Sequence, residues 1–296
     1  MKQIWRRFRP QKDTQNATIT PTRGNPSGDG TVYERAHGII DRQSIGKGRF
    51  WRRHDPHAFD SMIDAARGRA GATGDAAEWL AALILQAPRA VSAQRQMDKH
   101  PHGYHDKQAR LYELIDFNDT YVSTVLALEE REFATFNDET KRLMDRFCRH
   151  VGSPCLTGEQ WEAITHGLSR EISVYRGALK LGYTARMTSR REDAMGVDMV
   201  VTDAEGRSIN LDIKTRSSFH FRLQELHREG RVSELEREEA EQFGHSTVVN
   251  GHGHEAVTTT LLRIDEETYG RTIDFELERL EPLQLSIEQI FSLFSQ

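Results

Sequence analysis

The chain has 296 residues, of which 37% are hydrophobic and 29% are charged, and its net charge at pH 7 is -5. These values are typical of a globular protein with about two domains. The longest apolar run, residues 79–85, is far shorter than the ~20 residues that a membrane span needs, and the basic N-terminus lacks the apolar stretch of a signal peptide. The two cysteines, Cys148 and Cys155, are more typical of reduced thiols than of a disulfide framework. The sequence therefore predicts a cytoplasmic protein with no membrane partner.

Charge is distributed unevenly along the chain. Residues 1–60 contain 12 Lys or Arg against 6 Asp or Glu, whereas residues 201–296 contain 10 against 19. A mildly acidic whole is compatible with a local basic patch that binds nucleic acid, but it argues against a non-specific, histone-like binder. We expect residues 1–55 to form a basic, mobile arm.

One stretch within that arm, residues 45–53, mixes basic and aromatic side chains. Such a mixture can neutralise phosphates and stack on bases. The alternative is a solvated loop with two aromatic side chains tucked into the core. The candidate contacts with nucleic acid in this stretch are Lys47, Arg49, Trp51 and Arg52.

The next stretch, residues 56–150, predicts an α-helical domain. A helix is expected over residues 76–85, with Asp75 as its N-terminal cap. Asp138 is expected to cap a further helix that continues through residue 147. Residues 152–154, Gly-Ser-Pro, interrupt the helical pattern, and we place a domain boundary there.

The remaining residues, 151–296, combine helical and strand patterns. Thr157 is predicted to begin a helix, with Gln160 completing a capping box and Gly182 ending the helix. The elements expected after it are strands over 183–188, 197–202 and 208–215, a charged helix over 222–242, strands over 257–264 and 272–277, and a short amphipathic helix over 286–294. This order predicts an α/β or α+β domain, with a mixed β-sheet flanked by helices and preceded by the α-helical region.

Four polar residues stand out within that domain: Glu171, Asp198, Asp212 and Lys214. Because side chains alternate between the faces of a strand, Asp212 and Lys214 are expected to point the same way, opposite to their apolar neighbours. Asp198 opposes its apolar neighbours on the preceding strand in the same manner. Hard divalent cations prefer oxygen ligands, and cleavage of a phosphodiester needs a cation and an activated water. The four residues therefore predict a metal-dependent hydrolytic site.

The same stretch carries a recognisable order of motifs. The residues concerned are Glu171 on a helix, then Gly182-Tyr183, Gly196-Val197-Asp198 and Asp212-Ile213-Lys214. In this order they resemble the PD-(D/E)XK nuclease superfamily, in particular its Mrr-like and Holliday-junction-resolvase-like branch. The resemblance covers about residues 157–216. It implies a restriction-endonuclease-like fold, dependence on Mg²⁺ with Mn²⁺ able to substitute, and hydrolysis of phosphodiester bonds in DNA.

The resemblance also implies roles for individual residues. Glu171, Asp198 and Asp212 match the metal ligands, to which the Ile213 carbonyl is often added, and Lys214 matches the catalytic lysine. Two departures are visible: Val197 stands where the superfamily often has proline, and the last acid is Asp212 rather than the more frequent glutamate.

An acid-x-Lys triplet alone has no predictive value. Glu139-Thr140-Lys141 shows the same triplet at an expected helix start, without a partner acid on a strand. The prediction for residues 171–214 depends on the full order of motifs.

These features predict a Mg²⁺-dependent endodeoxyribonuclease of restriction, defence or DNA-processing type. A homodimer is expected because cutting a duplex needs two active sites, and further protein partners stay open. Arg190 and Arg191 are candidates for contact with DNA phosphates, or else lie in an exposed loop. Two alternatives remain: a catalytically inactive nucleic-acid-binding protein on a nuclease fold, and a nuclease that acts on RNA.

A second group of polar residues lies near Asn250 and Gly251. His245, His252 and His254 offer the spacing of a zinc site if two of them share a strand face. A glycine-rich turn with exposed histidines accounts for the same pattern, and we favour it.

Overall fold

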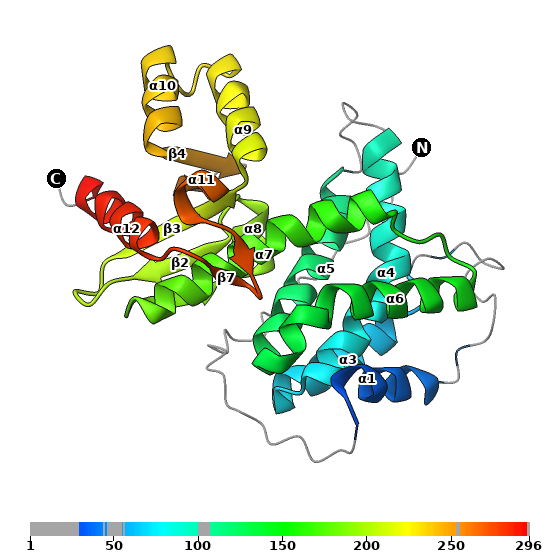
Figure 1. Cartoon of the computed structure of the whole chain (residues 1–296). Helices are drawn as coiled ribbons and strands as arrows, with labels where there is room; N and C mark the ends of the chain where they lie inside the picture. The colour runs from blue at the N-terminus through cyan, green and yellow to red at the C-terminus, as the bar shows by residue number, and fades with distance from the viewer. Residues whose placement is uncertain are drawn as a thin grey trace, which may run out of the picture.

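The computed structural model describes residues 30–43, 45, 55, 57–99, 107–252 and 255–294. It has an α+β architecture, in which helices from the first half of the chain lie beside a sheet-containing part built from the second half (Figure 1). No helix in the described part of the chain is long and apolar enough to cross a membrane. Residues 47, 49, 51 and 52, the candidate nucleic-acid contacts of the N-terminal region, lie outside the described residues.

The helical part contains most of one hydrophobic core. Its elements are α1 (Val32–Asp41), α3 (Asp60–Thr73), α4 (Ala76–Lys99), α5 (Lys107–Ala127), the 3-10 helix η1 (Glu130–Glu132) and α6 (Phe133–Val151). Helix α1 buries Val32, Ala36 and Ile39 in this core. The prediction of a mobile arm is therefore wrong for residues 32–41, because an apolar stripe holds them against the other helices.

Two predicted caps have different outcomes in this part. Asp75 accepts a hydrogen bond from the backbone N–H of Ala77 at 3.0 Å, so it caps α4 as expected. Asp138, in contrast, lies inside α6, which already begins at Phe133. The cap prediction at Asp138 is wrong because the buried Phe133 and Phe136 extend the apolar stripe of α6 toward the N-terminus.

Helix α7 (Gly158–Lys180) extends between the two parts (Figure 1). Its predicted capping box is present: the Thr157 side chain accepts from the backbone N–H of Gln160, and the Gln160 side chain accepts from that of Thr157. Trp161, Leu168 and Ile172 pack in the helical core, whereas the next residues on this helix, including Val174, pack in the core beneath the sheet. One helix, which follows the expected boundary at residues 152–154, therefore contributes side chains to both cores.

The sheet follows α7 and has five strands in the order β1-β2-β3-β5-β4. The strands are β1 (Thr184–Met187), β2 (Met199–Thr202), β3 (Ser208–Lys214), β4 (His245–His252) and β5 (Glu255–Arg263). Strands β1, β2 and β3 form an antiparallel meander, β3 pairs with β5 in parallel, and β4 pairs with β5 antiparallel. The mixed sheet that the sequence predicts is confirmed.

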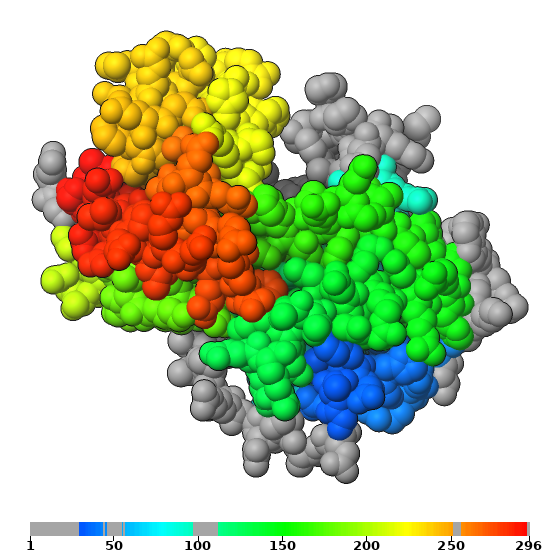
Figure 2. Space-filling model, viewed as in Figure 1, coloured from blue at the N-terminus to red at the C-terminus, as the bar shows by residue number. Residues whose placement is uncertain are grey.

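Helices cover both faces of this sheet. Val174 of α7 and Leu283 of α12 (Glu281–Leu293) pack with Leu211 and Leu262 on one face. On the other face, α9 (Arg216–Arg228) and α10 (Glu234–Phe243) form a smaller cluster that includes Leu261. In Figure 2, α9 and α10 form a projection from the rest of the sheet-containing part.

Several elements near the C-terminus differ from the predictions. The charged helix expected over 222–242 is two helices, because Gly230 adopts a positive φ of 69° and Ser233 caps α10 in a capping box with Glu236. The strand expected over 272–277 is a hairpin of two short strands, β6 (Thr272–Ile273) and β7 (Glu276–Leu277), after the short helix α11 (Glu266–Tyr269). Helix α12 begins five residues before the predicted start, at Glu281 followed by a proline suited to the first turn.

Candidate active site

The centre of the candidate site is the end of β3. The alternation is as predicted: Leu211 and Ile213 are buried in the core beneath the sheet, and Asp212 and Lys214 share the opposite face. Asp212 is only 4% exposed, and its carboxylate forms an ion pair with the Lys214 ammonium. Burial opposes the charge of Lys214, but the carboxylates around it outweigh that effect and raise its pKa above the ordinary value.

Asp198 lies beside Asp212, directly before β2. Its backbone N–H donates to the Leu211 carbonyl at 2.8 Å, and its carboxylate oxygen Oδ2 accepts from the backbone N–H of Ile213 at 2.6 Å. These two bonds fix the Asp198 side chain against the end of β3. Burial, together with the charge of Asp198 and a hydrogen bond between the two carboxyl groups, outweighs the attraction of Lys214 and raises the pKa of Asp212 to about 7.

Glu171 reaches the same cluster from α7. Burial, followed by the negative charge of Asp198, raises the pKa of Glu171 well above its usual range, while Lys214 acts in the opposite direction. All four residues singled out in the sequence therefore interact in one place. Three carboxyl groups surround a single ammonium group, so the cluster has an excess of acidic groups.

Two further acids belong to this environment and were not among the predicted site residues. Asp193 lies on the short helix α8 (Arg190–Ala194), where burial and the charge of Asp198 raise its pKa to about 8. Asp119 lies on α5 of the helical part; burial raises its pKa to about 7, and its charge in turn acts on Asp193. No pattern in the sequence distinguishes these two acids from surface acids, because only the packing of α5 against α8 brings them to the site.

The loop between α8 and β2 approaches β3 closely. Gly196 has a positive φ of 77°, and a Cβ atom at this position would lie 2.9 Å from the Asn250 amide nitrogen and 3.7 Å from Asp212 Oδ2. Asn250 of β4 is only 8% exposed, and its side-chain oxygen accepts from Arg222 and Arg231, each at 3.3 Å. Glycine is thus required here for both conformation and space.

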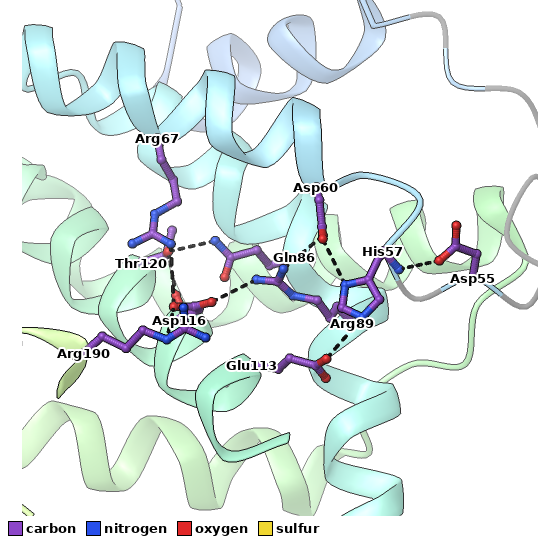
Figure 3. A network of polar contacts seen from close by, with 10 residues as sticks. All are labelled: Asp55, His57, Asp60, Arg67, Gln86, Arg89, Glu113, Asp116, Thr120 and Arg190. Atoms are coloured by element: carbon purple, nitrogen blue, oxygen red, sulfur yellow. Dashed lines mark hydrogen bonds and ion pairs between the residues drawn. The ribbon is translucent and has the colours of Figure 1, made fainter. Parts of the chain in front are cut away.

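A charged network attaches α8 to the helical part (Figure 3). Arg190 lies 3.3 Å from Asp116 of α5, and its guanidinium stands 4.5 Å from the centre of the Tyr112 ring. Asp116 also pairs with Arg89 of α4 at 3.3 Å and with Arg67 of α3 at 4.0 Å. Arg190 is itself exposed, and its guanidinium contacts α5 of the helical part.

Arg191, the second arginine proposed for contact with DNA, follows Arg190 in the first turn of α8. The capping box of Ser189 and Glu192 begins this helix. The alternative placed Arg190 and Arg191 in an exposed loop. Both residues are exposed, but they lie in a short helix whose start follows from the Ser-x-x-Glu pattern.

An open pocket of about 620 Å³ lies against the acidic cluster. It is bounded by α7, the end of β3 and the first turns of α9. Its lining residues are Gly167, Arg170, Glu171, Ile213, Lys214, Thr215, Ser217, Ser218, Phe221 and Arg222. Two of the predicted catalytic residues, Glu171 and Lys214, are thus reached from outside through this pocket.

The group of His245, His252 and His254 is the second candidate site of the sequence, and part of it lies on β4. His245 begins β4, and Asn250 and Gly251 lie within this strand, so the expected turn does not lie at Asn250 and Gly251. Pairing with β5 takes up the backbone of the whole segment. His245 is partly buried, and burial lowers its pKa. The side chains of His252 and His254 lie outside the described residues.

The arrangement of possible metal ligands is also clear. In the part of the chain that the structure describes, no three histidine, cysteine, aspartate or glutamate side chains are gathered closely enough to hold a metal ion. Lys214 instead takes the place of a counter-ion at Asp212. Comparisons with models of protein families, with curated proteins and with solved structures find no match for this chain.

Proposed function

We propose that the protein is a Mg²⁺-dependent endodeoxyribonuclease of the PD-(D/E)XK superfamily, acting in restriction, defence or DNA processing. The observation that carries the proposal is that Glu171 on α7, Asp198 directly before β2 and Asp212 on β3 all act on Lys214, beside an open pocket. The order of motifs in the sequence independently suggested the same four residues.

The chemistry of these donors fits a hard divalent cation. Carboxylate and carbonyl oxygens are the ligands that Mg²⁺ prefers, and the carboxylates of Glu171, Asp198 and Asp212, with the Ile213 carbonyl, would hold the ion. Burial and mutual repulsion raise the pKa values of Glu171 and Asp212, so a cation would relieve an unfavourable concentration of acidic groups. When bound, the cation would polarise the phosphate and lower the pKa of water.

The residues of the chain have separable roles in this proposal. Lys214 orients the attacking water or stabilises the negative charge that develops on the phosphate. Asp198 is held in place by the backbone N–H of Ile213. Asp193 and Asp119 add further negative charge around the cluster, and their raised pKa values make each of them a store for a proton near neutral pH.

The direct test is a cleavage assay with supercoiled plasmid, branched DNA, single strands and RNA, with Mg²⁺ and with a chelator. We expect Mg²⁺-dependent cleavage of DNA that Asp212→Ala and Lys214→Ala each abolish. Lys141→Ala is the matched control, because Glu139-Thr140-Lys141 is the same triplet on α6, and Lys141 pairs only locally with Asp145. Unchanged cleavage by both Asp212→Ala and Lys214→Ala would remove the assignment, and cleavage of RNA alone would favour the RNA-directed alternative. A homodimer is part of the proposal where both strands are cut.

A second candidate is a non-catalytic nucleic-acid-binding protein on the same fold. One observation favours it: Lys214 pairs with Asp212, and the acids in the described part of the chain are not gathered as a ready metal site. Binding of DNA with no cleavage of any substrate, in the presence of Mg²⁺ or Mn²⁺, would support this candidate.

A further inference from the structure

The pocket beside the acidic cluster has features that the proposed hydrolytic chemistry does not use. They come from α7 and from the first turns of α9. The residues concerned are Arg170, Ser217, Ser218, Phe221 and Arg222.

Arg170 is a buried cation whose hydrogen bonds go to backbone carbonyls. It is 8% exposed, and its guanidinium donates to two neutral acceptors, the carbonyl of Ile264 at 3.2 Å and that of His166 at 3.0 Å. The charges of Glu266 and Asp265 act on Arg170, but neither acid forms a direct ion pair with it among the described residues. Arg89 and Arg263, which are also well buried, each pair with an aspartate within 3.3 Å. A buried guanidinium without such a partner, at the wall of an open pocket, is suited to bind an anion from outside.

The beginning of α9 presents groups that also favour an anion. Thr215 caps this helix by accepting from the backbone N–H of Ser218, and the hydroxyls of Ser217 and Ser218 lie at the pocket. The amino end of a helix of this length favours negative charge. Together with Arg170 and Lys214, it makes this wall of the pocket suitable for phosphate.

Phe221 adds an aromatic surface one turn further along α9. It lines the pocket although 57% of it is exposed, so part of its ring is open to a ligand. Exposed aromatic side chains next to cationic groups bind nucleic acid by stacking on bases. A base offers its face for stacking only when it has left the duplex.

We propose that this pocket binds one unpaired nucleotide next to the bond that is cut. Its phosphate lies against Arg170 and the start of α9, and its base stacks on Phe221. The inference rests on the proposed function, because it treats the acidic cluster as the place of cleavage. It predicts that the protein prefers DNA with unpaired nucleotides, such as single strands, flaps or branches, to continuous duplex.

Binding without cleavage tests this inference. Fluorescence anisotropy of the full chain in a chelator compares a labelled single-stranded oligonucleotide with a blunt duplex of the same sequence. We expect tighter binding of the single strand, a loss of about tenfold in its affinity for Phe221→Ala, and near-normal affinity for Phe221→Tyr. Phe243→Ala is the matched control, since Phe243 on α10 is also 57% exposed but does not line the pocket.

Arg170→Lys provides a second, independent variant. It keeps the charge but loses the planar fork of donors, so we expect weaker binding of the single strand, with a Tm measurement to show that the fold is kept. Equal affinities of wild type, Phe221→Ala and Phe243→Ala would overturn the inference, as would equal losses by Phe221→Ala on single strand and duplex. Binding that depends on Phe221 without any cleavage under Mg²⁺ would support the nucleotide pocket while removing the proposed nuclease activity.

Discussion

Replacing Asp212 by asparagine is expected to stabilise the folded chain at alkaline pH. In the folded protein, burial and Asp198 raise the pKa of Asp212 from 3.8 to about 7. A carboxyl group with a raised pKa contributes stability that is complete below pH 3.8 and is lost as the pH rises through about 7. Asparagine resembles the neutral acid and cannot ionise, so Asp212→Asn escapes this loss.

The size of the effect follows from the same shift. A rise from 3.8 to about 7 corresponds to roughly 4 kcal/mol of unfolding free energy between the two extremes of pH. This shift already includes the attraction of Lys214, which lowers the pKa of Asp212. Relaxation of the folded chain around the charge reduces the measured effect. We therefore expect the unfolding free energy of Asp212→Asn to exceed that of wild type by about 2 kcal/mol at pH 8 and to be almost equal to it at pH 4.

Urea unfolding in a chelator at these two values of pH measures the gain. Glu192→Gln is a control of opposite sign. Hydrogen bonds from Arg186 lower the pKa of Glu192 to about 2, so its charge stabilises the fold above its ordinary pKa of 4.5, and this variant should lose stability at pH 8. An Asp212→Asn variant that is no more stable than wild type at pH 8, or a gain at pH 4 equal to that at pH 8, would refute the reasoning.

Three further substitutions test the parts of the fold that support the site. Arg190→Ala removes the pair with Asp116 and the contact over Tyr112, and should lower the unfolding free energy by about 1 kcal/mol in denaturant titrations. Additive effects of Arg190→Ala and Asp116→Asn in a double-mutant cycle would argue against an interaction between these two residues. Gly196→Ala places a Cβ atom on a residue with a positive φ and close to the Asn250 amide. We therefore expect thermal unfolding to show a loss of about 1–2 kcal/mol in unfolding free energy. An unchanged Tm would contradict this crowding. Thr157→Ala removes the cap of α7 and should lower the unfolding free energy by about 1 kcal/mol, whereas Thr157→Ser should keep most of that stability. Equal Tm values for the two variants would show that the cap is unimportant.

Local signals in the sequence were sufficient for the centre of the site. Alternation along residues 208–214 placed Asp212 and Lys214 on one face because the apolar residues between them need burial on the other. The Thr157 capping box and the mixed sheet were predicted for similar reasons. Each of these features depends on residues that are close together in the chain.

Other local signals were present and were misread. Thr31 and Glu34 form a capping box at the start of α1, so the pattern Thr-x-x-Glu marked a helix in the region assigned to a mobile arm. Ser233 and Glu236 mark the start of α10 in the same way, which would have divided the charged helix in two. At Asp138, an isolated aspartate does not show whether the apolar stripe of a helix continues before it.

The remaining features of the site depend on packing between distant segments. Asp119 on α5 meets Asp193 on α8 only because the helical part packs against the loop before β2. Asn250 reaches Gly196 because β5 joins the sheet next to β3 and brings β4 to its edge. The pairing of Arg170 with backbone carbonyls is visible only when its surroundings are known. Sequence patterns do not contain this information.

Titration calorimetry with Mn²⁺ tests the central claim most directly, since it measures whether the acidic cluster holds a cation without relying on the identity of the DNA substrate. The account predicts that wild type binds Mn²⁺ and releases protons at neutral pH, because the pKa values of Asp212 and Asp193 are raised to about 7 and about 8. It predicts no binding by Asp198→Ala and normal binding by Lys141→Ala. No binding of Mn²⁺ by wild type, or binding that Asp198→Ala leaves unchanged, would contradict a metal-dependent site formed by these residues.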